Sequence, residues 1–212
     1  GGYIMPNHVY FNIQLSLDAG ETALVEKLSK KVEYMEGSGD FKYKSYDLSL
    51  LPIYPTPYQE DNWYAWGCDN MGAKWVNCEE FEDTYITGYS AWSPPIPLVE
   101  NLVQYIYDQV GGKVSAEMTY EDEFRNFVGK VETWIENGKA YHDIEEVDGE
   151  ELNQLMLEAY GKEEDWFHSD DFDWWVEYPI VKGSQKGEKM EAQTYVDELV
   201  YDFFDKGRVE LL

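Results

Sequence analysis

The sequence predicts an α+β protein in which helices pack on one face of an antiparallel sheet. Alternating apolar and polar residues recur in several short segments, and two longer segments have the periodicity of amphipathic helices. Turns rich in glycine or proline separate these segments. With 212 residues, of which 43% are hydrophobic and 17% aromatic, the chain has enough apolar material to fold around a sizeable core despite its charge.

The first part of the chain is expected to form a strand, a helix and a second strand. Residues 8–17 alternate apolar and polar side chains, as a half-buried strand does. Residues 21–36 place apolar side chains on one helical face, and a glycine-rich turn ends the expected helix. Residues 41–51 change their apolar phase near Ser45, which predicts a strand with a bulge.

The most aromatic part of the chain, residues 63–97, is expected to form the centre of the core. Large rings contribute much buried area, and this stretch holds four of the eight tryptophans, namely Trp63, Trp66, Trp75 and Trp92. A short helix at residues 59–66 and a hairpin of strands at residues 74–81 and 84–92 are expected here. The prolines that follow stop the second strand and lead the chain into a helix.

A second clear helix and three strands come next. Residues 98–110 carry an apolar face made of Leu98, Val99, Leu102, Val103, Ile106 and Val110. Strands are expected at residues 113–119, 126–135 and 139–147, the last two joined by a tight turn at Glu136-Asn137-Gly138. The order β-α-β, repeated once and extended by extra strands, matches a ferredoxin-like sheet with two helices on one face. The other face is expected to be open or covered by later segments.

The chain is expected to divide into two parts, a ferredoxin-like domain at residues 1–147 and an acidic C-terminal elaboration at residues 148–212. The second part is aromatic and mostly helical, and it is expected to pack on the first. Its helices are predicted at residues 149–160 and 190–204, with an acidic connector and a flexible link between them. Residues 1–4 look like a vector-derived extension, which makes Met5 the expected natural start.

Four segments carry motifs of a known family: Met5-Pro6-Asn7-His8-Val9, Trp66-Gly67 with Gly72-Ala73-Lys74-Trp75, Ser90-Ala91-Trp92-Ser93-Pro94-Pro95-Ile96-Pro97, and Tyr120-Glu121-Asp122-Glu123 with Phe127-Val128-Gly129. They resemble the Api-like proteins, uncharacterised proteins of bacteriophages and mobile elements. The resemblance covers about residues 5–140, and its most specific part is the Ala-Trp-Ser-Pro-Pro motif. Cys68 to Met71 interrupt the second motif, and the acidic C-terminal region has no counterpart. The resemblance implies a phage origin and a ferredoxin-like domain, and it implies no established activity or site.

The formal net charge is −27, from 43 acidic and 16 basic residues. This charge repels nucleic acid and anionic membranes and favours basic protein partners. Duplex DNA carries a comparable number of charges over the width of a compact chain of this size, so mimicry of DNA is physically feasible. The alternative is that the charge serves solubility through self-repulsion alone.

Acidic residues are concentrated between residues 141 and 177, where fourteen of them alternate with aromatic residues and a single lysine. A disordered acidic tail lacks such rings, so this segment is expected to fold or dock. It supplies the candidate partner-binding residues, which are Glu163, Glu164, Asp165, Trp166, Asp170, Asp171, Asp173, Trp174 and Trp175. The alternative is a solvated acidic face whose rings pack inward.

The sequence predicts no catalytic residue, metal site or cofactor. Cys68 and Cys78 lack zinc-ligand spacing, and neither has a local motif that would pair it with His142 for nucleophilic catalysis. Residues 142–146 and 168–173 offer imidazole and carboxylate ligands, but neither group has the spacing of a calcium loop. A solvated acidic surface is the simpler interpretation of both groups.

Three functions follow from these observations. The first is a phage-encoded, non-enzymatic protein that mimics DNA charge and inhibits a basic, nucleic-acid-binding host protein of defence or restriction. The second is a small-molecule enzyme with a pocket near the aromatic stretch, and the third is a structural protein that self-associates through its sheet. Two unpaired cysteines and the lack of a signal peptide or membrane-spanning run favour the cytoplasm of a host cell.

Overall fold

The computed structural model describes residues 7–36, 43–82, 84–123 and 126–150, together with two short strands farther along the chain. The chain divides into two units, residues 1–146 and 147–212. In the second unit, β9 (Trp175–Glu177) pairs antiparallel with β10 (Lys189–Glu191). The helix predicted from residue 190 is therefore wrong at its start, and the rest of the predicted C-terminal elaboration lies outside the described residues.

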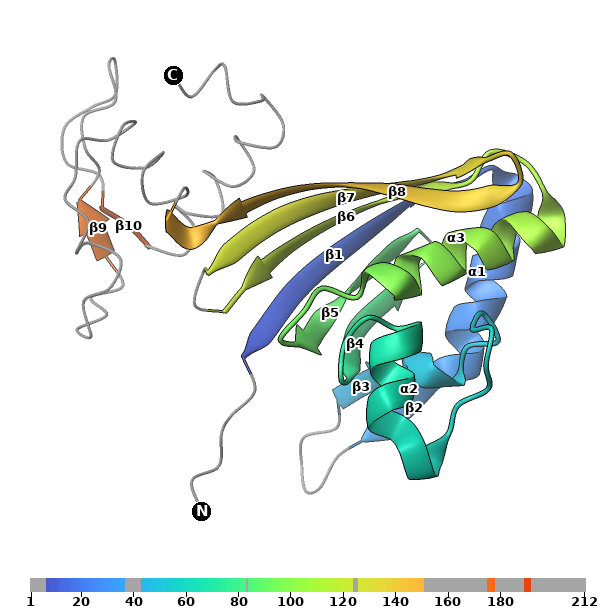
Figure 1. Cartoon of the computed structure of the whole chain (residues 1–212), viewed down its shortest axis with the longest axis horizontal. Helices are drawn as coiled ribbons and strands as arrows, with labels where there is room; N and C mark the ends of the chain where they lie inside the picture. The colour runs from blue at the N-terminus through green and yellow to red at the C-terminus, as the bar shows by residue number, and fades with distance from the viewer. Residues whose placement is uncertain are drawn as a thin grey trace. The chain divides into compact units, whose positions relative to one another are not determined.

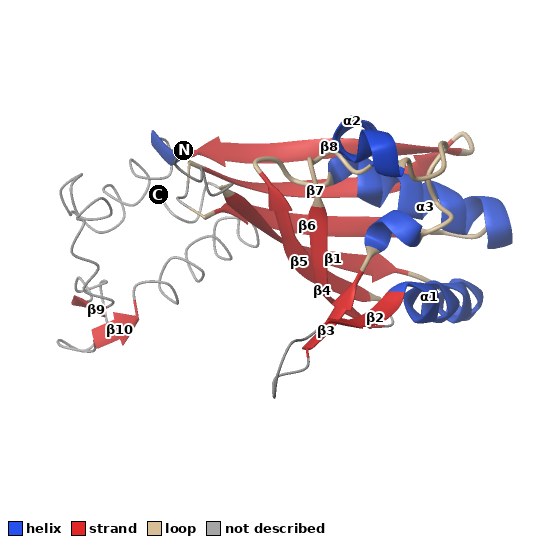
Figure 2. Cartoon of the chain, turned by 90° about the horizontal axis from the view of Figure 1, so that it is seen from below, coloured by secondary structure: helices blue, strands red, loops and turns tan. Residues whose placement is uncertain are grey.

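The first unit is built on an eight-stranded sheet with the order β2-β3-β4-β5-β1-β6-β7-β8 (Figure 2). All the neighbouring pairs from β2 to β7 are antiparallel. The strands are β1 (His8–Ser16), β2 (Glu33–Glu36), β3 (Tyr43–Tyr46), β4 (Val76–Glu82), β5 (Tyr85–Ala91), β6 (Ser115–Asp122), β7 (Phe127–Glu136) and β8 (Lys139–Asp148). With its helices, this sheet confirms the predicted α+β class.

In the part of the chain that the structure describes, three α-helices lie on one side of this sheet (Figure 1): α1 (Ala19–Val32), α2 (Trp63–Asn70) and α3 (Ile96–Val110). Two helices were expected from their apolar periodicity. The third, α2, extends beyond the predicted segment at residues 59–66, and a 3₁₀ turn, η2 (Glu60–Asn62), precedes it. The apolar stripe of α3 packs against the sheet as predicted, except that Val110 at its end is exposed.

The core is mostly aliphatic, with a few rings such as Phe11 and Phe81 among its fully buried side chains. Val9, Phe11, Ile13 and Leu15 of β1 are buried, and they pack with the apolar stripes of α1 and α3. Burial of such side chains is the main favourable term in folding, at about 1.5–3 kcal/mol for each fully buried large residue. The periodicity of β1 and α3 therefore identified the core correctly.

The prediction that residues 63–97 form the centre of the core is wrong in part. Of the four tryptophans in this stretch, only Trp66 is buried, while Trp63 and Trp92 are 44% and 45% exposed. Trp66 packs between the rings of Tyr54 and Tyr58, and its Nε1 donates to Thr56 O at 3.0 Å. An aromatic-rich stretch predicted burial here, whereas half of its tryptophan rings lie at the surface.

Two predicted elements end earlier than the periodicity indicated. The helix predicted over residues 21–36 stops at Val32, and Glu33–Glu36 form β2, because their backbone pairs with β3. The strand predicted over residues 41–51 stops at Tyr46. Asp47 then accepts hydrogen bonds from the backbone N–H and hydroxyl of Ser49, which fold the chain into the 3₁₀ turn η1 (Leu48–Leu50).

The bulge expected near Ser45 lies instead in β4, where the register with β5 shifts between Cys78 and Glu80. The predicted hairpin turn is confirmed: Asn137 and Gly138 have φ angles of 50° and 80°, as a type I′ turn requires between β7 and β8. Gly111, with φ 69°, ends α3. The turn residues thus predicted the hairpin correctly, whereas the change in apolar alternation near Ser45 predicted a bulge in the wrong strand.

The helices leave the opposite side of the sheet to polar and half-buried side chains. On β1, residues that alternate with the buried ones are exposed along the length of the strand. None of the helices in the described ranges combines the length and the apolar character that a membrane span requires.

Candidate functional site

The surface opposite the helices, called the open face from here on, consists of the outward side chains of β1, β4, β5, β6 and β7. The register carries the exposed phase of β1 across the sheet, because Tyr10 lies opposite Tyr89 on one side and Glu121 on the other. The open face comprises Tyr10, Asn12, Gln14, Glu80, Glu82, Tyr85, Thr87, Tyr89, Glu117, Thr119, Glu121, Lys130, Glu132 and Trp134. It combines carboxylates with aromatic rings.

Negative charge dominates these five strands. They contain eight acidic residues, and Lys130 is their only lysine or arginine. Neighbouring strands lie about 4.8 Å apart, and outward residues repeat about every 6.8 Å along a strand. The carboxylates are therefore held at regular spacing by the backbone ladder, with little backbone freedom to lose when a partner docks.

Lys130 neutralises one pair of glutamates on the open face. Glu117 and Glu132 lie directly opposite each other on β6 and β7, a position where like charges are destabilising. The Nζ of Lys130 lies 3.0 Å from a carboxylate oxygen of each. Burial lowers the pKa of Lys130, but the hydrogen bonds and charges of both glutamates outweigh burial and raise it above its ordinary value. Lys130 thus offsets the repulsion between the carboxylates of Glu117 and Glu132.

Around Tyr10 the open face is both aromatic and acidic. The ring of Tyr10 lies 6.2 Å from that of Tyr89, centroid to centroid. The pKa of Tyr10 is raised by burial, and also by the negative charges of Glu123, Glu79 and Glu121. Carboxylates from β4, from β6 and from the residue after β6 thus gather around one exposed tyrosine. Such rings are common anchors in protein interfaces.

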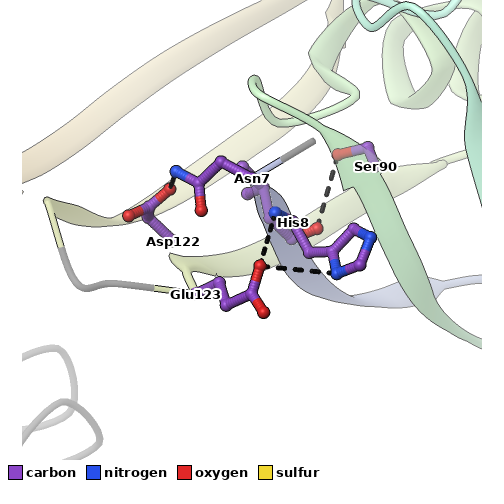
Figure 3. Close-up of polar contacts among 6 residues, drawn as sticks. Asn7, His8, Ser90, Asp122 and Glu123 are labelled. Carbon is purple, nitrogen blue, oxygen red and sulfur yellow. Dashed lines mark hydrogen bonds and ion pairs between the residues drawn. The ribbon is translucent and has the colours of Figure 1, made fainter. Parts of the chain in front are cut away.

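At the start of β1, His8 adds a further ring to this cluster. Its ring centroid lies 5.0 Å from that of Tyr89 and 5.7 Å from that of Trp75. Figure 3 shows Glu123 reaching the backbone and the ring of His8, with its Oε2 atom 3.1 Å from the backbone N and 3.5 Å from Nδ1. The end of the open face is therefore ordered by packed rings and a carboxylate.

A buried polar network fixes this end of the sheet. Asp122 is almost fully buried and accepts a hydrogen bond from the side chain of Asn7 (Figure 3). It also accepts hydrogen bonds from the backbone and side chain of Asn126. The backbone N–H of Trp92 donates to Asn7 O at 2.9 Å, and Ser90 Oγ donates to Val9 O at 3.4 Å. Three of the four segments whose motifs resemble the Api-like proteins thus meet here.

A second aromatic cluster surrounds Lys74. Its Nζ lies 5.8, 5.6 and 5.0 Å from the ring centroids of Trp63, Tyr64 and Trp92, each of which is about half exposed. Trp92 has a left-handed backbone with φ 66°, a strained conformation for a bulky residue. The hydrogen bond to Asn7 O and the packing on Lys74 hold it there. The cluster accounts for exposed rings without requiring a ligand.

The candidate residues predicted from the acidic C-terminal segment are not brought together by the described structure. Eight of them, Glu163, Glu164, Asp165, Trp166, Asp170, Asp171, Asp173 and Trp174, lie outside the described residues. Trp175 begins β9, and its backbone alone is described. The open face supplies the same combination of residue types at positions the sequence analysis did not select. The outward phase of each predicted strand was the signal that could have found it.

Among the described residues, the candidate catalytic and metal-binding side chains do not converge on a common site. His142 Nδ1 lies 2.7 Å from Glu100 Oε1 on α3, whereas strand alternation directs Asp143 to the other face. Within the described ranges no three or more histidine, cysteine or acidic side chains could hold a metal ion together. Cys68 is exposed on α2, and Cys78 is buried in β4, where burial and Glu79 raise the pKa of its thiol. A thiol held protonated in this way is a poor nucleophile.

Comparison with protein-family models, curated proteins and solved structures finds no significant match. The resemblance to the Api-like proteins therefore stays a prediction from the four motifs. The functional argument depends on the geometry and charge of the open face.

Proposed function

We propose that this chain is a non-enzymatic binding protein whose open face docks a basic, nucleic-acid-binding protein. The observation that carries the proposal is the row of outward carboxylates and rings on β1, β4, β5 and β6, which includes Glu80, Glu82, Glu121 and Tyr10. Charge at such a surface raises the rate of encounter with a basic partner, and packed rings supply contact area. The net charge of −27 favours the same class of partner.

The density of charge supports mimicry of DNA. Five strands about 4.8 Å apart span about 19 Å, and duplex DNA carries about 11 phosphate charges over that length. The open face carries five glutamates and one lysine, a net of four negative charges over a similar width. This is about a third of the charge density of DNA with the same sign, so a protein that binds DNA through a basic cleft is a suitable partner. The acidic segment containing Glu163 and Asp170 is proposed to add charge to the same interaction.

The proposed fold is ferredoxin-like, with extensions. The order β4-β5-β1-β6, with α1 after β1 and α3 between β5 and β6, supports a double β-α-β unit. The strands β2 and β3 are then an insertion after α1, and β7 and β8 extend the other edge. The phage origin, the host cytoplasm as location and a defence or restriction protein as partner depend on the motif resemblance and on charge.

Capture from a bacterial lysate with matched charge variants tests this function. The variant Glu80→Gln/Glu82→Gln/Glu121→Gln removes three carboxylates from the open face and leaves the Lys130 ion pairs in place. The control Glu26→Gln/Glu60→Gln/Asp69→Asn removes three exposed carboxylates from α1, η2 and α2. Both variants change the net charge equally.

We expect the open-face variant to bind the captured basic protein about 30-fold more weakly at low salt. This estimate assigns about 0.7 kcal/mol to each of the three removed charges. The control should change the affinity by less than about 3-fold, because its charges lie away from the interface and are screened. An equal loss of affinity in both variants would mean that net charge, and not the open face, determines binding. Capture of no basic protein at low salt would refute the proposal.

A further inference from the structure

The strand β8 ends the order of the sheet and presents a long edge. It has ten residues, and β7 is its only neighbour among the described strands. Exposed edges are usually shortened, bulged or carry proline or inward lysine, since their unpaired N–H and C=O groups template pairing with other chains. β8 has no proline, and its single lysine is its first residue, Lys139. Such an edge can accept an additional strand.

The hairpin geometry determines which backbone groups point away from β7. Because the turn has two residues, Glu136 and Lys139 flank it as a hydrogen-bonded pair, and the even-numbered residues of β8 direct their N–H and C=O groups outward. Two contacts agree with this assignment. The N–H of Ala140 donates to Gln104 Oε1 of α3 at 2.8 Å, and the N–H of Ile144 donates to Asp143 Oδ1 at 3.1 Å. The side chain of Gln104 thus occupies the first outward N–H of the edge. The part of the edge considered for an additional strand is the stretch from His142 to Glu146.

The side chains along this stretch are acidic on both faces. Tyr120 Oη donates to Glu146 Oε2 at 2.7 Å, which places Glu146 on the helix side of the sheet. Alternation then directs Asp143 and Glu145 to the side of the open face. All three residues are exposed, as is Ile144 at 43% of its surface. A strand that lies along this edge meets carboxylates on both sides and an apolar contact.

We propose that the β8 edge accepts an extended segment rich in lysine or arginine, from a protein partner, as a ninth strand of the sheet. Backbone hydrogen bonds supply affinity in this mode of recognition, and alternate side chains supply specificity. This inference rests on the proposed function, since the basic partner supplies the segment. A second copy fits poorly, because pairing two β8 edges brings Asp143, Glu145 and Glu146 of both copies together, and like charges across strands are destabilising.

Hydrogen exchange of the full chain with two synthetic peptides tests the edge directly. One probe is a decapeptide of alternating lysine and valine, and the other replaces each lysine with glutamate. We expect the lysine peptide to slow exchange of the outward amides of His142 and Glu146 about ten-fold or more, and the glutamate peptide to leave them unchanged. Protection of these amides without any peptide would assign the edge to a second copy or to the chain's own residues, and would overturn the inference.

Two variants at one position separate the backbone from the side chain. In Ile144→Pro the outward N–H, which donates to Asp143 Oδ1 in the free protein, is lost. The ladder with β7 is retained, because proline is tolerated on an edge strand whose N–H points away from its neighbour. Ile144→Ala removes the same side chain and keeps the N–H. We expect Ile144→Pro to bind the lysine peptide about ten-fold more weakly than Ile144→Ala. Equal binding by the two variants would overturn the inference.

Charge reversal gives a test that does not depend on proline. The variant Asp143→Lys/Glu145→Lys should prefer the glutamate peptide over the lysine peptide, and an unchanged preference would overturn the inference. These results are independent of the lysate capture. Loss of capture in the open-face variant, with equal peptide binding by Ile144→Pro and Ile144→Ala, would support the proposed function. It would refute the addition of a strand at the β8 edge.

Discussion

At the scale of single residues, burial and close contact decide which side chains stabilise the protein and which remain available to a partner. Leu102 of α3 is fully buried among the side chains of the core, whereas Leu50 of η1 is 58% exposed. The same residue type therefore has different energetic weight at the two positions. The sequence indicated this difference for α3, where the periodicity is helical, and missed it for η1, which it predicted as a strand.

Leu102→Ala should lower the free energy of unfolding by about 2–5 kcal/mol, because it removes buried methyl groups and leaves a cavity. Leu50→Ala is the matched control and should change it by less than about 0.5 kcal/mol. Urea denaturation of both variants checks the pair. Similar values for the two would mean that α3 does not pack on the sheet as described.

Ionisation of Tyr54 is expected to lower the free energy of unfolding at alkaline pH. Its hydroxyl donates to Leu48 O at 2.8 Å, and burial, followed by the charges of Asp47 and Cys78, raises its pKa above the ordinary value. In the unfolded chain this tyrosine loses its proton near pH 10, before it would do so in the folded protein. Stability is therefore complete below about pH 10 and is lost as the pH rises further.

Tyr54→Phe should reduce this loss. Each such group contributes a slope of up to about 1.4 kcal/mol per pH unit, so the variant should lose stability less steeply than the wild type above about pH 10. Urea denaturation at a series of alkaline pH values measures both slopes. Identical slopes would show that the phenol of Tyr54 ionises as readily in the folded protein as in the unfolded chain.

At the scale of elements, the sequence was most informative where periodicity, capping and turn residues agreed. β1, α3 and the β7–β8 hairpin combine a regular apolar pattern with a definite boundary, and all three were predicted. β2 was missed because local periodicity continued the helix, whereas its backbone pairs with β3, which begins after six intervening residues. Pairing with a neighbouring strand overrides local propensity in such segments.

Close approach of β4 and β5 makes Gly88 a test of the sheet. A Cβ atom at this position would collide with the backbone oxygen of Asn77 on the neighbouring strand. Gly88→Ala should therefore cost about 1–3 kcal/mol, since the strands must shift. Gly20→Ala, in α1 with no atom within 4 Å of the added Cβ, is the control and should gain up to about 1 kcal/mol. Thermal melting compares the two, and a neutral Gly88→Ala would contradict the described register of β4 and β5.

At the scale of the whole molecule, the sequence predicted a surface that combines acidic and aromatic residues. The structure has such a surface on the open face, at other residues than those predicted. Acidic and aromatic residues were expected to act together between residues 163 and 175, because they are adjacent in the chain there. On the open face the same types come from five strands spread between His8 and Glu136, so no local run reveals them. Only the outward phase of each strand, combined with the strand order, brings them together.

The interaction of the open face with a basic partner is the central claim, and carboxyl labelling read by mass spectrometry tests it most directly. The captured complex and the free protein are treated with a carbodiimide and an amine, which modify accessible carboxylates. We predict that the complex protects Glu80, Glu82 and Glu121 and leaves Glu26, Glu60 and Asp69 as reactive as in the free protein. Protection of the helix-side carboxylates alone would contradict the account.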